Sequence, residues 1–327
     1  MPTSADTPRV VILATGGTIA GTAADAADDL GYRAAQLGVD DLVAAVPALA
    51  QRAIETEQVA QVDSKDMTHA IWRRLAGRVA AHLARPEVQG IVVTHGTDTL
   101  EETAYLLQRV LAPAKPVVLT AAMRPASSRR PDGPQNLLDA VTVAAEPGWA
   151  GVVAVVAGAV HAAFDVRKVH TRRREAFGSG EAGPLGRIEG GRVLRLRDAG
   201  PAGRPLGLAL LDAEPWPRVE IVASHAGADG RIVDALLAQG GLDGLVVAAT
   251  GHGTLHEALE AALRRAREAG VVVHRATRVL EGRVQGREGD AFPVSPAGTP
   301  QQARVELMLA LLAGGTRAAQ APSRLGR

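Results

Sequence analysis

The stretch Val10-Val11-Ile12-Leu13-Ala14-Thr15-Gly16-Gly17-Thr18-Ile19-Ala20-Gly21 is an apolar run that ends directly in a turn of glycine and threonine. Short apolar runs bounded in this way are typical of strands buried on both faces of a parallel sheet. Similar runs occupy residues 91–94, 117–120 and 152–156. Between them, apolar residues recur every three or four positions over residues 100–111, which predicts a helix. Strands and helices therefore alternate, and the fold class is α/β with a parallel sheet covered on both sides by helices.

A segment rich in proline and glycine divides the chain. Residues 200–217 contain the runs PAGRPLG and EPWP, which are typical of a connection between folding units. The sequence predicts an N-terminal α/β catalytic domain over residues 1–199, a linker over 200–217 and a smaller C-terminal α/β domain over 218–327. The second domain has predicted strands at 219–223, 245–249 and 271–274, with helices near 232–237 and over 255–268. The end of the chain from residue 314 has little to bury, so we expect it to be frayed.

Composition narrows the chemistry. The 327 residues include 36 basic and 35 acidic side chains, so the net charge of +1 provides no large field to attract nucleic acid or an anionic membrane. Cysteine is absent, which excludes disulfides, thiolate metal sites and cysteine nucleophiles. The apolar runs are shorter than the roughly 18 residues that a membrane span requires. The polar start, MPTSADTPR, lacks the pattern of a secretory signal, so we expect a cytoplasmic protein.

Two strand ends carry hydroxyl groups beside glycine. The first strand ends in Thr15-Gly16-Gly17-Thr18, and a second ends in Thr94-His95-Gly96-Thr97-Asp98-Thr99. Ligands bind at the carboxyl edge of open α/β sheets, and neighbouring parallel strands would bring both motifs to one cleft. The alternatives are a tight glycine turn in the first motif and a helix cap in the second, with Glu101 and Glu102 complementing the helix dipole. A dinucleotide site is disfavoured, because the glycine spacing does not fit G-x-G-x-x-G.

Four segments of the sequence resemble those of one known protein family. ILATGGTIAG, VDSKDMT, VVTHGTDTLEETAYLL and VLTAAMRPASSRRPDGPQNLLDAV, in this order and spacing, resemble the bacterial-type L-asparaginase and glutaminase-asparaginase family. The similarity extends to the PQQARVEL segment near the C-terminus. It implies a large flavodoxin-like N-terminal domain, a small C-terminal α/β domain and a homotetramer built as a dimer of dimers. It also implies that neither a metal nor an organic cofactor is used, and that the substrate is a small amino acid amide.

The resemblance also implies roles for individual residues. Thr18 is similar to the primary nucleophile and Tyr32 to the residue that activates it, while Thr97 and Lys168 resemble a second threonine with its lysine partner. Further positions in the implied site are Gly17, Ser64, Lys65, Asp98 and Glu288. Ser64 would hold the substrate α-carboxylate and Asp98 the α-ammonium group. Backbone N–H groups near Gly17 and Thr97 would stabilise the tetrahedral intermediate.

An acidic residue from the neighbouring subunit would complete each site. Glu288 is the candidate for this position, and Glu281 is the alternative because loop lengths differ around it. A threonine hydroxyl hardly ionises near neutral pH, so each nucleophile needs a hydrogen-bonded base whose pKa is lowered by its neighbours. The implied reaction is hydrolysis of L-asparagine to L-aspartate and ammonia, through an acyl-enzyme or by direct displacement.

Lys65 departs from the family pattern. Relatives commonly have glutamine or glutamate after the carboxylate-binding serine, and lysine cannot accept a hydrogen bond from an ammonium group. Repulsion of the substrate ammonium would cost about 4 kcal/mol at 4 Å and an effective dielectric constant of 20. We therefore expect Lys65 to turn away or to pair with Asp98, Asp66 or a borrowed glutamate. The sequence predicts a raised Michaelis constant for asparagine and little glutamine activity.

Other functions stay open at this stage. The chain could act on glutamine or another small amide, or feed ammonia to a transfer-RNA-charging reaction as an amidotransferase subunit, although no basic patch is evident. A non-catalytic amino acid sensor could keep the same pocket, and a dinucleotide oxidoreductase is the remaining alternative. His252 and His256, four residues apart, could bind a metal, but neither a carboxylate nor a third ligand is evident nearby.

Overall fold

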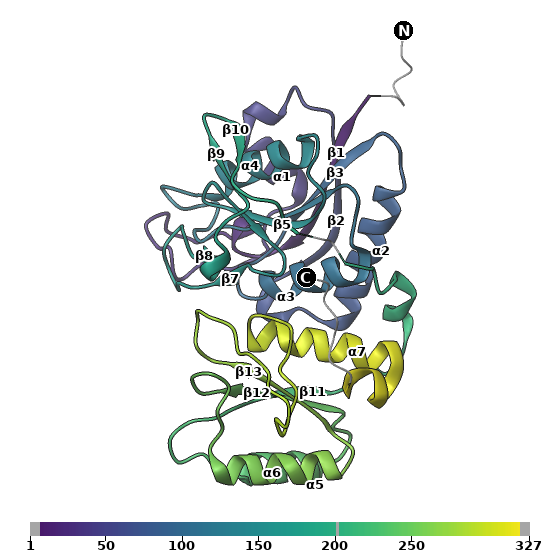
Figure 1. Cartoon of the computed structure of the whole chain (residues 1–327). Coiled ribbons are helices and arrows are strands. Elements are labelled where there is room, and N and C mark those ends of the chain that lie inside the picture. Colours follow the sequence, from purple (N-terminus) through teal and green to yellow (C-terminus); the bar gives the residue numbers. More distant parts are fainter. Residues whose placement is uncertain (1–6, 201–202, 321–327) are drawn as a thin grey trace. The chain divides into compact units, whose positions relative to one another are not determined.

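The computed structural model of the chain describes residues 7–200 and 203–320 (Figure 1). Parts of the polar start, of the predicted linker and of the predicted frayed end therefore lie outside the described residues. The chain forms two compact units, Met1–Leu208 and Ala209–Arg327, and the division between them falls inside segment 200–217. Each unit has its own sheet and its own core.

The larger unit contains an eight-stranded sheet in the order β10-β9-β6-β5-β4-β3-β1-β2. The five neighbouring strands from β5 to β2 are parallel. Their bounds are Arg9–Gly16 for β1, Ile54–Val62 for β2, Val88–Thr94 for β3, Pro116–Thr120 for β4 and Gly151–Val156 for β5. The predicted parallel sheet is confirmed for this part of the unit.

Three antiparallel strands, which the sequence did not predict, extend the sheet beyond β5. They are β6 (Ala159–Ala162), β9 (Gly186–Glu189) and β10 (Arg192–Arg195). Each is only four residues long, and β9 and β10 carry charged residues, so none forms an apolar run of the length used to find the parallel strands. The sheet is therefore mixed rather than purely parallel.

Helices cover both faces of the sheet in the larger unit. Alternate residues of a strand point to opposite faces, and both Ile12 and Leu13 of β1 are fully buried. Ile12 shares a core with residues of α1 and α4, among them Leu42 and Leu137. The helices are α1 (Val39–Ala44), α2 (His69–Leu83), α3 (Leu100–Leu111) and α4 (Gly133–Ala145). The predicted helix over residues 100–111 is confirmed as α3.

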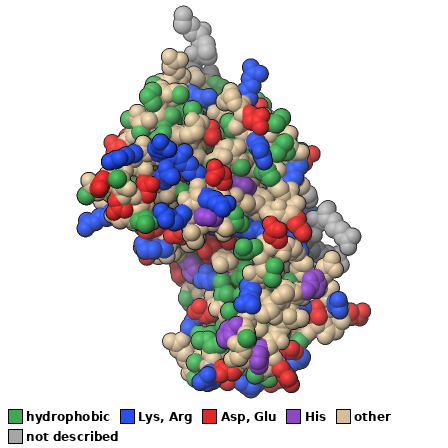
Figure 2. Space-filling model, turned by 90° about the vertical axis from the view of Figure 1, so that its left-hand side faces the viewer, with side chains coloured by type: hydrophobic (Ala, Val, Ile, Leu, Met, Phe, Trp, Pro, Cys, Tyr) green, Lys and Arg blue, Asp and Glu red, His purple; other side chains and the backbone are tan. Residues whose placement is uncertain are grey.

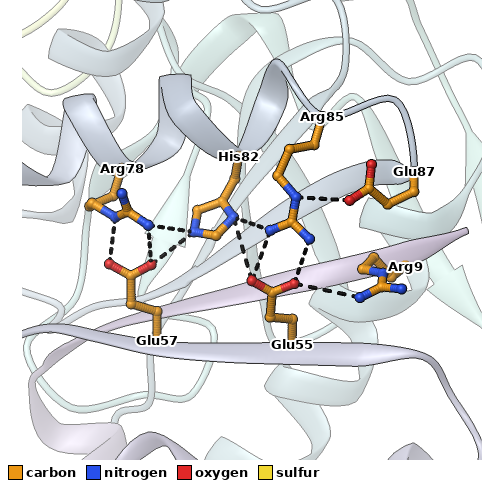
Figure 3. Close-up of polar contacts among 7 residues, drawn as sticks. All are labelled: Arg9, Glu55, Glu57, Arg78, His82, Arg85 and Glu87. Atoms are coloured by element: carbon orange, nitrogen blue, oxygen red, sulfur yellow. Dashed lines mark hydrogen bonds and ion pairs between the residues drawn. The ribbon is translucent and has the colours of Figure 1, made fainter. Parts of the chain in front are cut away.

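A network of ion pairs ties the edge strand β2 to α2 (Figure 3). Arg85 donates to Glu55 through both terminal nitrogens at 2.8 Å, and Arg78 donates to Glu57 at 2.6 and 2.8 Å. His82 lies between the two pairs, with Nε2 2.8 Å from Glu57 Oε2. These arginines hold the pKa of each glutamate below its usual value. The network therefore fixes charged residues of β2 that an apolar core could not hold.

In the described part of the smaller unit, up to residue 320, a three-stranded parallel sheet is accompanied by three α-helices. The strands are β11 (Val219–Ala223), β12 (Gly244–Ala249) and β13 (Val272–Thr277), and the helices are α5 (Arg231–Gln239), α6 (Glu257–Glu268) and α7 (Pro300–Gln320). The predicted α/β unit is confirmed. The prediction of a frayed end is wrong for residues 314–320, because α7 continues to Gln320 even through Gly314 and Gly315, which disfavour a helix.

The surface carries charges of both signs. On the face shown in Figure 2, acidic side chains lie among and around the basic ones, as the net charge of +1 leads one to expect. Across residues 7–200 and 203–320, none of the helices combines the length and the apolar character that crossing a bilayer demands.

Candidate active site

The carboxyl ends of the first three parallel strands meet at one edge of the sheet. The N–H of Gly17, just after β1, donates to Val62 O at the end of β2 at 2.9 Å. The hydroxyl of Thr15 donates to Thr94 O at the end of β3, also at 2.9 Å. Since β1 lies between β2 and β3, the two threonine motifs emerge side by side. The prediction that neighbouring strands bring them together is confirmed.

Two glycines allow the motifs to touch. A Cβ on Gly17 would lie 2.4 Å from the Cα of Gly96, and a Cβ on Gly96 would lie 2.4 Å from Ser64 Oγ. Gly17 also has a φ of 81°, in the region that side chains avoid. The first motif is thus a tight glycine turn, and in it the backbone just before Thr18 lies against the backbone just before Thr97.

Thr18 lies in a short 3₁₀ turn, Thr18–Ala20, directly after β1. Its side chain is buried, with only 7% of the residue exposed. The hydroxyl oxygen lies 2.7 Å from the phenolic oxygen of Tyr32, and either group could donate. Tyr32 reaches this position from the following loop, which closes through an isolated bridge between Thr22 and Arg33. The structure therefore brings together the predicted nucleophile and its predicted partner.

The loop that carries Tyr32 is held at several points. Oδ1 of Asp28 accepts the N–H groups of Leu30 and Gly31 at 2.8 and 2.7 Å, and these bonds lower the pKa of Asp28. The loop between β4 and α4 also contributes, since Ser127 Oγ accepts the N–H of Ala23 at 2.7 Å. These bonds fix the turn of the loop just before Tyr32.

The second motif forms a separate cluster. Lys168 Nζ donates to Thr97 Oγ1 at 2.8 Å and to Asp98 Oδ1 at 2.6 Å. Thr97 is buried, whereas the side chain of Asp98 is 51% exposed and faces solvent. Lys168 comes from β7 (Arg167–Lys168), 71 residues further along the chain. Predicted residues that are far apart in sequence therefore meet at the start of α3.

Ser64 lies buried beside the second motif. Its Oγ accepts the N–H of Asp98 at 3.1 Å, and its carbonyl accepts the hydroxyl of Thr99 at 2.8 Å. Because the oxygen is the acceptor in the first bond, the hydroxyl proton of Ser64 remains available to a ligand.

Lys65 turns away from this cluster. Its Nζ lies 2.7 Å from Asp63 Oδ2 and 3.2 Å from Asp66 Oδ2, and 61% of its side chain is exposed. Both carboxylates raise the pKa of Lys65. The predicted pairing with Asp66 is confirmed, whereas Asp63, the nearer partner, was not predicted.

A buried hydrogen-bond chain supports the peptide before Thr97. Trp72 Nε1 donates to Thr103 Oγ1 at 2.8 Å, so the hydroxyl proton of Thr103 points to His95 Nε2 at 3.0 Å. His95 Nδ1 then donates to Gly96 O at 2.8 Å. Burial lowers the pKa of His95 to about 4, so the ring is neutral near neutral pH. The sequence contained this histidine in a recognised motif, but nothing in the pattern indicated its partners.

The remaining predicted residues lie in the smaller unit. Glu288 and Glu281 are both exposed, in the segment that follows β13. Nδ1 of His256 accepts the N–H of Ala258 and so caps α6, while Nε2 of His252 accepts the N–H of Gln285. Among the residues that the structure describes, no three His, Cys, Asp or Glu side chains are grouped so that they could share a metal ion.

Comparison with known proteins agrees with this geometry. Residues 9–199 match the family model "Asparaginase, N-terminal" and residues 218–321 match "Glutaminase/Asparaginase C-terminal domain". The chain is 39% identical to L-asparaginase 2 of Escherichia coli, over 93% of this chain and 89% of the relative. It is 38% identical to a probable periplasmic L-asparaginase of Haemophilus influenzae, over 94% and 90% of the two chains.

A solved structure shares the fold. The crystal structure of a probable cytoplasmic L-asparaginase from Campylobacter jejuni superposes with a TM-score of 0.89 at 35% identity, and the match covers 96% of this chain and 98% of the other. The N-terminal family model and the shared fold both span the strand ends at which the two threonine motifs meet. The chain therefore belongs to the bacterial-type asparaginase family of amidohydrolases.

Proposed function

We propose that this protein hydrolyses the side-chain amide of L-asparagine to L-aspartate and ammonia, with a threonine as nucleophile. One observation carries the proposal: two threonine hydroxyls, each bonded to a group that can accept a proton, lie at one edge of the sheet. The pairs are Thr18 with Tyr32 at 2.7 Å and Thr97 with Lys168 at 2.8 Å. Glutaminase activity is the alternative, and the description of the C-terminal family model names both enzymes.

Thr18 acts as the primary nucleophile in this proposal. Its buried hydroxyl attacks the amide carbon while the oxygen of Tyr32, 2.7 Å away, takes up the proton in its deprotonated form. Ammonia leaves after protonation. Water then releases aspartate if an acyl-enzyme forms, and attacks directly if Thr18 only assists a displacement.

Thr97, Asp98 and Lys168, the second cluster, act on the same carbonyl group of the substrate amide. Lys168 accepts the proton of Thr97 once it has lost its own, and Asp98 holds the amine in place through the 2.6 Å bond. The N–H of Gly17 already donates to Val62 O, so it is not the donor for the developing oxyanion. The N–H of Thr97 is the candidate, and one such donor is worth about 10²- to 10³-fold in rate.

The free amino acid substrate carries two charges, which need partners beside the reacting groups. Ser64 can donate its hydroxyl proton to the α-carboxylate, because its oxygen already accepts the N–H of Asp98. The exposed carboxylate of Asp98 can accept the α-ammonium group in addition to Lys168. Lys65, held by Asp63 and Asp66, makes no direct contribution in the present geometry.

Assembly and location form part of the proposal. The acidic residue that would complete the site comes from a second subunit, with Glu288 as the candidate, in a homotetramer built as a dimer of dimers. Sedimentation velocity at micromolar concentration tests the assembly. We propose a cytoplasmic location, as for the similar Campylobacter protein, although the similar Haemophilus protein is described as periplasmic. Fractionation of cells that express the chain distinguishes the two.

Ammonia release and product analysis test the reaction. The panel consists of L-asparagine, L-glutamine, their D forms and amides without the α-amino group. Thr18→Ala, Thr97→Val and Lys168→Met should each lower kcat by several orders of magnitude, while the far-ultraviolet circular dichroism spectrum stays unchanged. Tyr32→Phe should lower kcat by about 10²-fold. A Thr18→Ala variant within tenfold of the wild-type rate would sink the nucleophile assignment. Ligand that binds but stays unconverted over hours would indicate a sensor instead.

A further inference from the structure

Lys168 is placed by a very short element. β7 contains only Arg167 and Lys168, and it pairs with the equally short β8 (Phe177–Gly178). A two-residue ladder cannot by itself hold a long, flexible side chain in one place. Yet Nζ of Lys168 lies within 2.8 Å of both Thr97 Oγ1 and Asp98 Oδ1. Some further contact must fix the backbone from which this side chain extends.

Glu101 provides that contact. Its Oε2 accepts the backbone N–H of Lys168 at 2.7 Å, across 67 residues of sequence. Glu101 lies in the first turn of α3, where the N-terminal end of the helix dipole stabilises a negative charge. Only 7% of the residue is exposed, so the bond forms away from competing water.

Both ends of Lys168 are thus bonded to one short segment, residues 97–101. The amine reaches Thr97 and Asp98 just before α3 begins, and the backbone N–H reaches Glu101 in the first turn of the same helix. The helix that presents Thr97 also sets the position of the lysine, so any shift of α3 moves both groups together.

We propose that Glu101 is a positioning residue for the amide hydrolysis, which fixes Lys168 against Thr97 by accepting its backbone N–H. This inference rests on the proposed function, in which Lys168 takes the proton of Thr97. Glu101 touches no reacting atom in this role. It acts through Lys168, and its loss should lower kcat rather than weaken substrate binding, because Ser64 and Asp98 remain in place.

Two nearly isosteric substitutions separate the hydrogen bond from the volume of the side chain. Glu101→Met fills the same space without an acceptor and leaves the partly buried N–H of Lys168 without its present partner. Glu101→Gln keeps an oxygen that can accept the N–H. We expect Glu101→Met to lower kcat by about 10²-fold with KM changed little, as displacements of about 1 Å do, and Glu101→Gln to restore most of the loss. Glu102→Ala, in the same turn, is the matched control and should leave kcat unchanged.

A double-mutant cycle with Lys168→Met tests whether the effect passes through the lysine. In the Lys168→Met background, Glu101→Met should cause no further loss of kcat, because the group that it positions is absent. An equal loss in both backgrounds would overturn the inference, as would a Glu101→Gln variant as slow as Glu101→Met. If Glu101→Met does not fold, Glu101→Asp, one methylene shorter, takes its place, and a wild-type kcat for this variant would also count against the role.

The two proposals fail in different ways. A Lys168→Met variant with the wild-type rate contradicts the proposed function itself. A strongly impaired Lys168→Met variant together with a fully active Glu101→Met variant contradicts only the positioning role of Glu101.

Discussion

Gly17 and Gly96 lie backbone against backbone, and no side chain fits between them. A methyl group on Gly17 would lie 2.4 Å from the Cα and the nitrogen of Gly96, far inside van der Waals contact. Each of these glycines directly precedes one of the two threonines in the candidate site. The distance between Thr18 and Thr97 therefore depends on two residues that themselves carry no functional group.

Gly17→Ala should separate the two motifs. The added methyl group collides with backbone rather than with a flexible side chain, and the φ of 81° disfavours alanine as well. We expect a loss of stability of at least about 1–3 kcal/mol and nearly complete loss of ammonia release. Gly77→Ala in α2 is the control, because no atom lies within 4 Å of the added carbon, and it should stabilise the protein by about 0.5–1 kcal/mol. Urea denaturation of both variants measures the difference, and an active, stable Gly17→Ala protein contradicts the argument.

Hybrid assemblies test the shared site. If Glu288 completes the site of a neighbouring subunit, Glu288→Ala and Thr18→Ala proteins are each inactive, but a mixed tetramer contains some sites with both residues intact. Mixing after dissociation and reassociation should restore part of the ammonia release. The same mixture made with Glu281→Ala tests the alternative residue. No recovery with either glutamate variant would argue against a borrowed acid, as would a monomer that works at full rate.

Lys65→Gln should improve asparagine binding. The substitution removes a side chain that Asp63 and Asp66 hold away from Ser64, and it introduces one that can turn inward and accept a hydrogen bond from the substrate ammonium. A charge-assisted bond is worth about 1.5–3 kcal/mol, so KM should fall by about tenfold or more. Lys65→Met, which removes the charge without adding an acceptor, is the control. Steady-state kinetics that are the same for Lys65→Gln and the wild type would mean that the ion pairs with Asp63 and Asp66 keep this position out of the site.

Two buried histidines should make the stability of the protein depend on pH. Burial lowers the pKa of both His95 and His161 to about 4, with the positive charge of Arg197 as a further cause at His161. In the unfolded chain both rings titrate near 6.5, so below that pH the unfolded state binds protons that the folded state refuses. Stability is therefore fully present above about pH 6.5 and is lost as the pH falls towards 4, by up to about 3 kcal/mol for each ring.

The free energy of unfolding, measured with urea between pH 7 and pH 4, checks this expectation. In the middle of this range, the slope of the unfolding free energy against pH should correspond to about two more protons bound by the unfolded than by the folded state. His161→Asn should reduce this difference by about one proton. Asparagine is chosen because its amide can still form a hydrogen bond with Ser179, whose Oγ lies 2.8 Å from His161 Nδ1. A slope that does not change on substitution would show that the histidine is accessible to protons in the folded state.

Most of the parallel part of the fold could be predicted because its hydrophobic patterns are local in sequence. Residues 100–111 form an apolar stripe next to a polar turn, and α3 has the same bounds. β2 was missed because IETEQVAQV contains no continuous apolar run. Its glutamates are held by Arg78 of α2 and by Arg85 just after that helix, and no local pattern reveals these pairs. The three antiparallel strands are too short to stand out from turns.

The site was predictable only in part for a similar reason. The strand ends indicated where the threonines of both motifs would lie. Lys168 was assigned to the site only through the family resemblance, because the sequence around it is typical of an exposed basic surface. The bond between Glu101 and the N–H of Lys168 joins a side chain to a backbone group 67 residues away. Residue types carry no signal for such a contact, so only the structure reveals it.

β2 ends the sheet of the larger unit, and in the part of the chain that the structure describes it pairs with β1 alone. Such an edge can recruit a strand from another molecule, and repeated recruitment leads to fibrous aggregates. Glu55 and Glu57 work against this, because charged side chains on an edge strand disfavour the addition of a further strand, and both are held in place by Arg85 and Arg78. The charges that attach β2 to α2 thus also help to keep concentrated protein from forming open-ended β-assemblies.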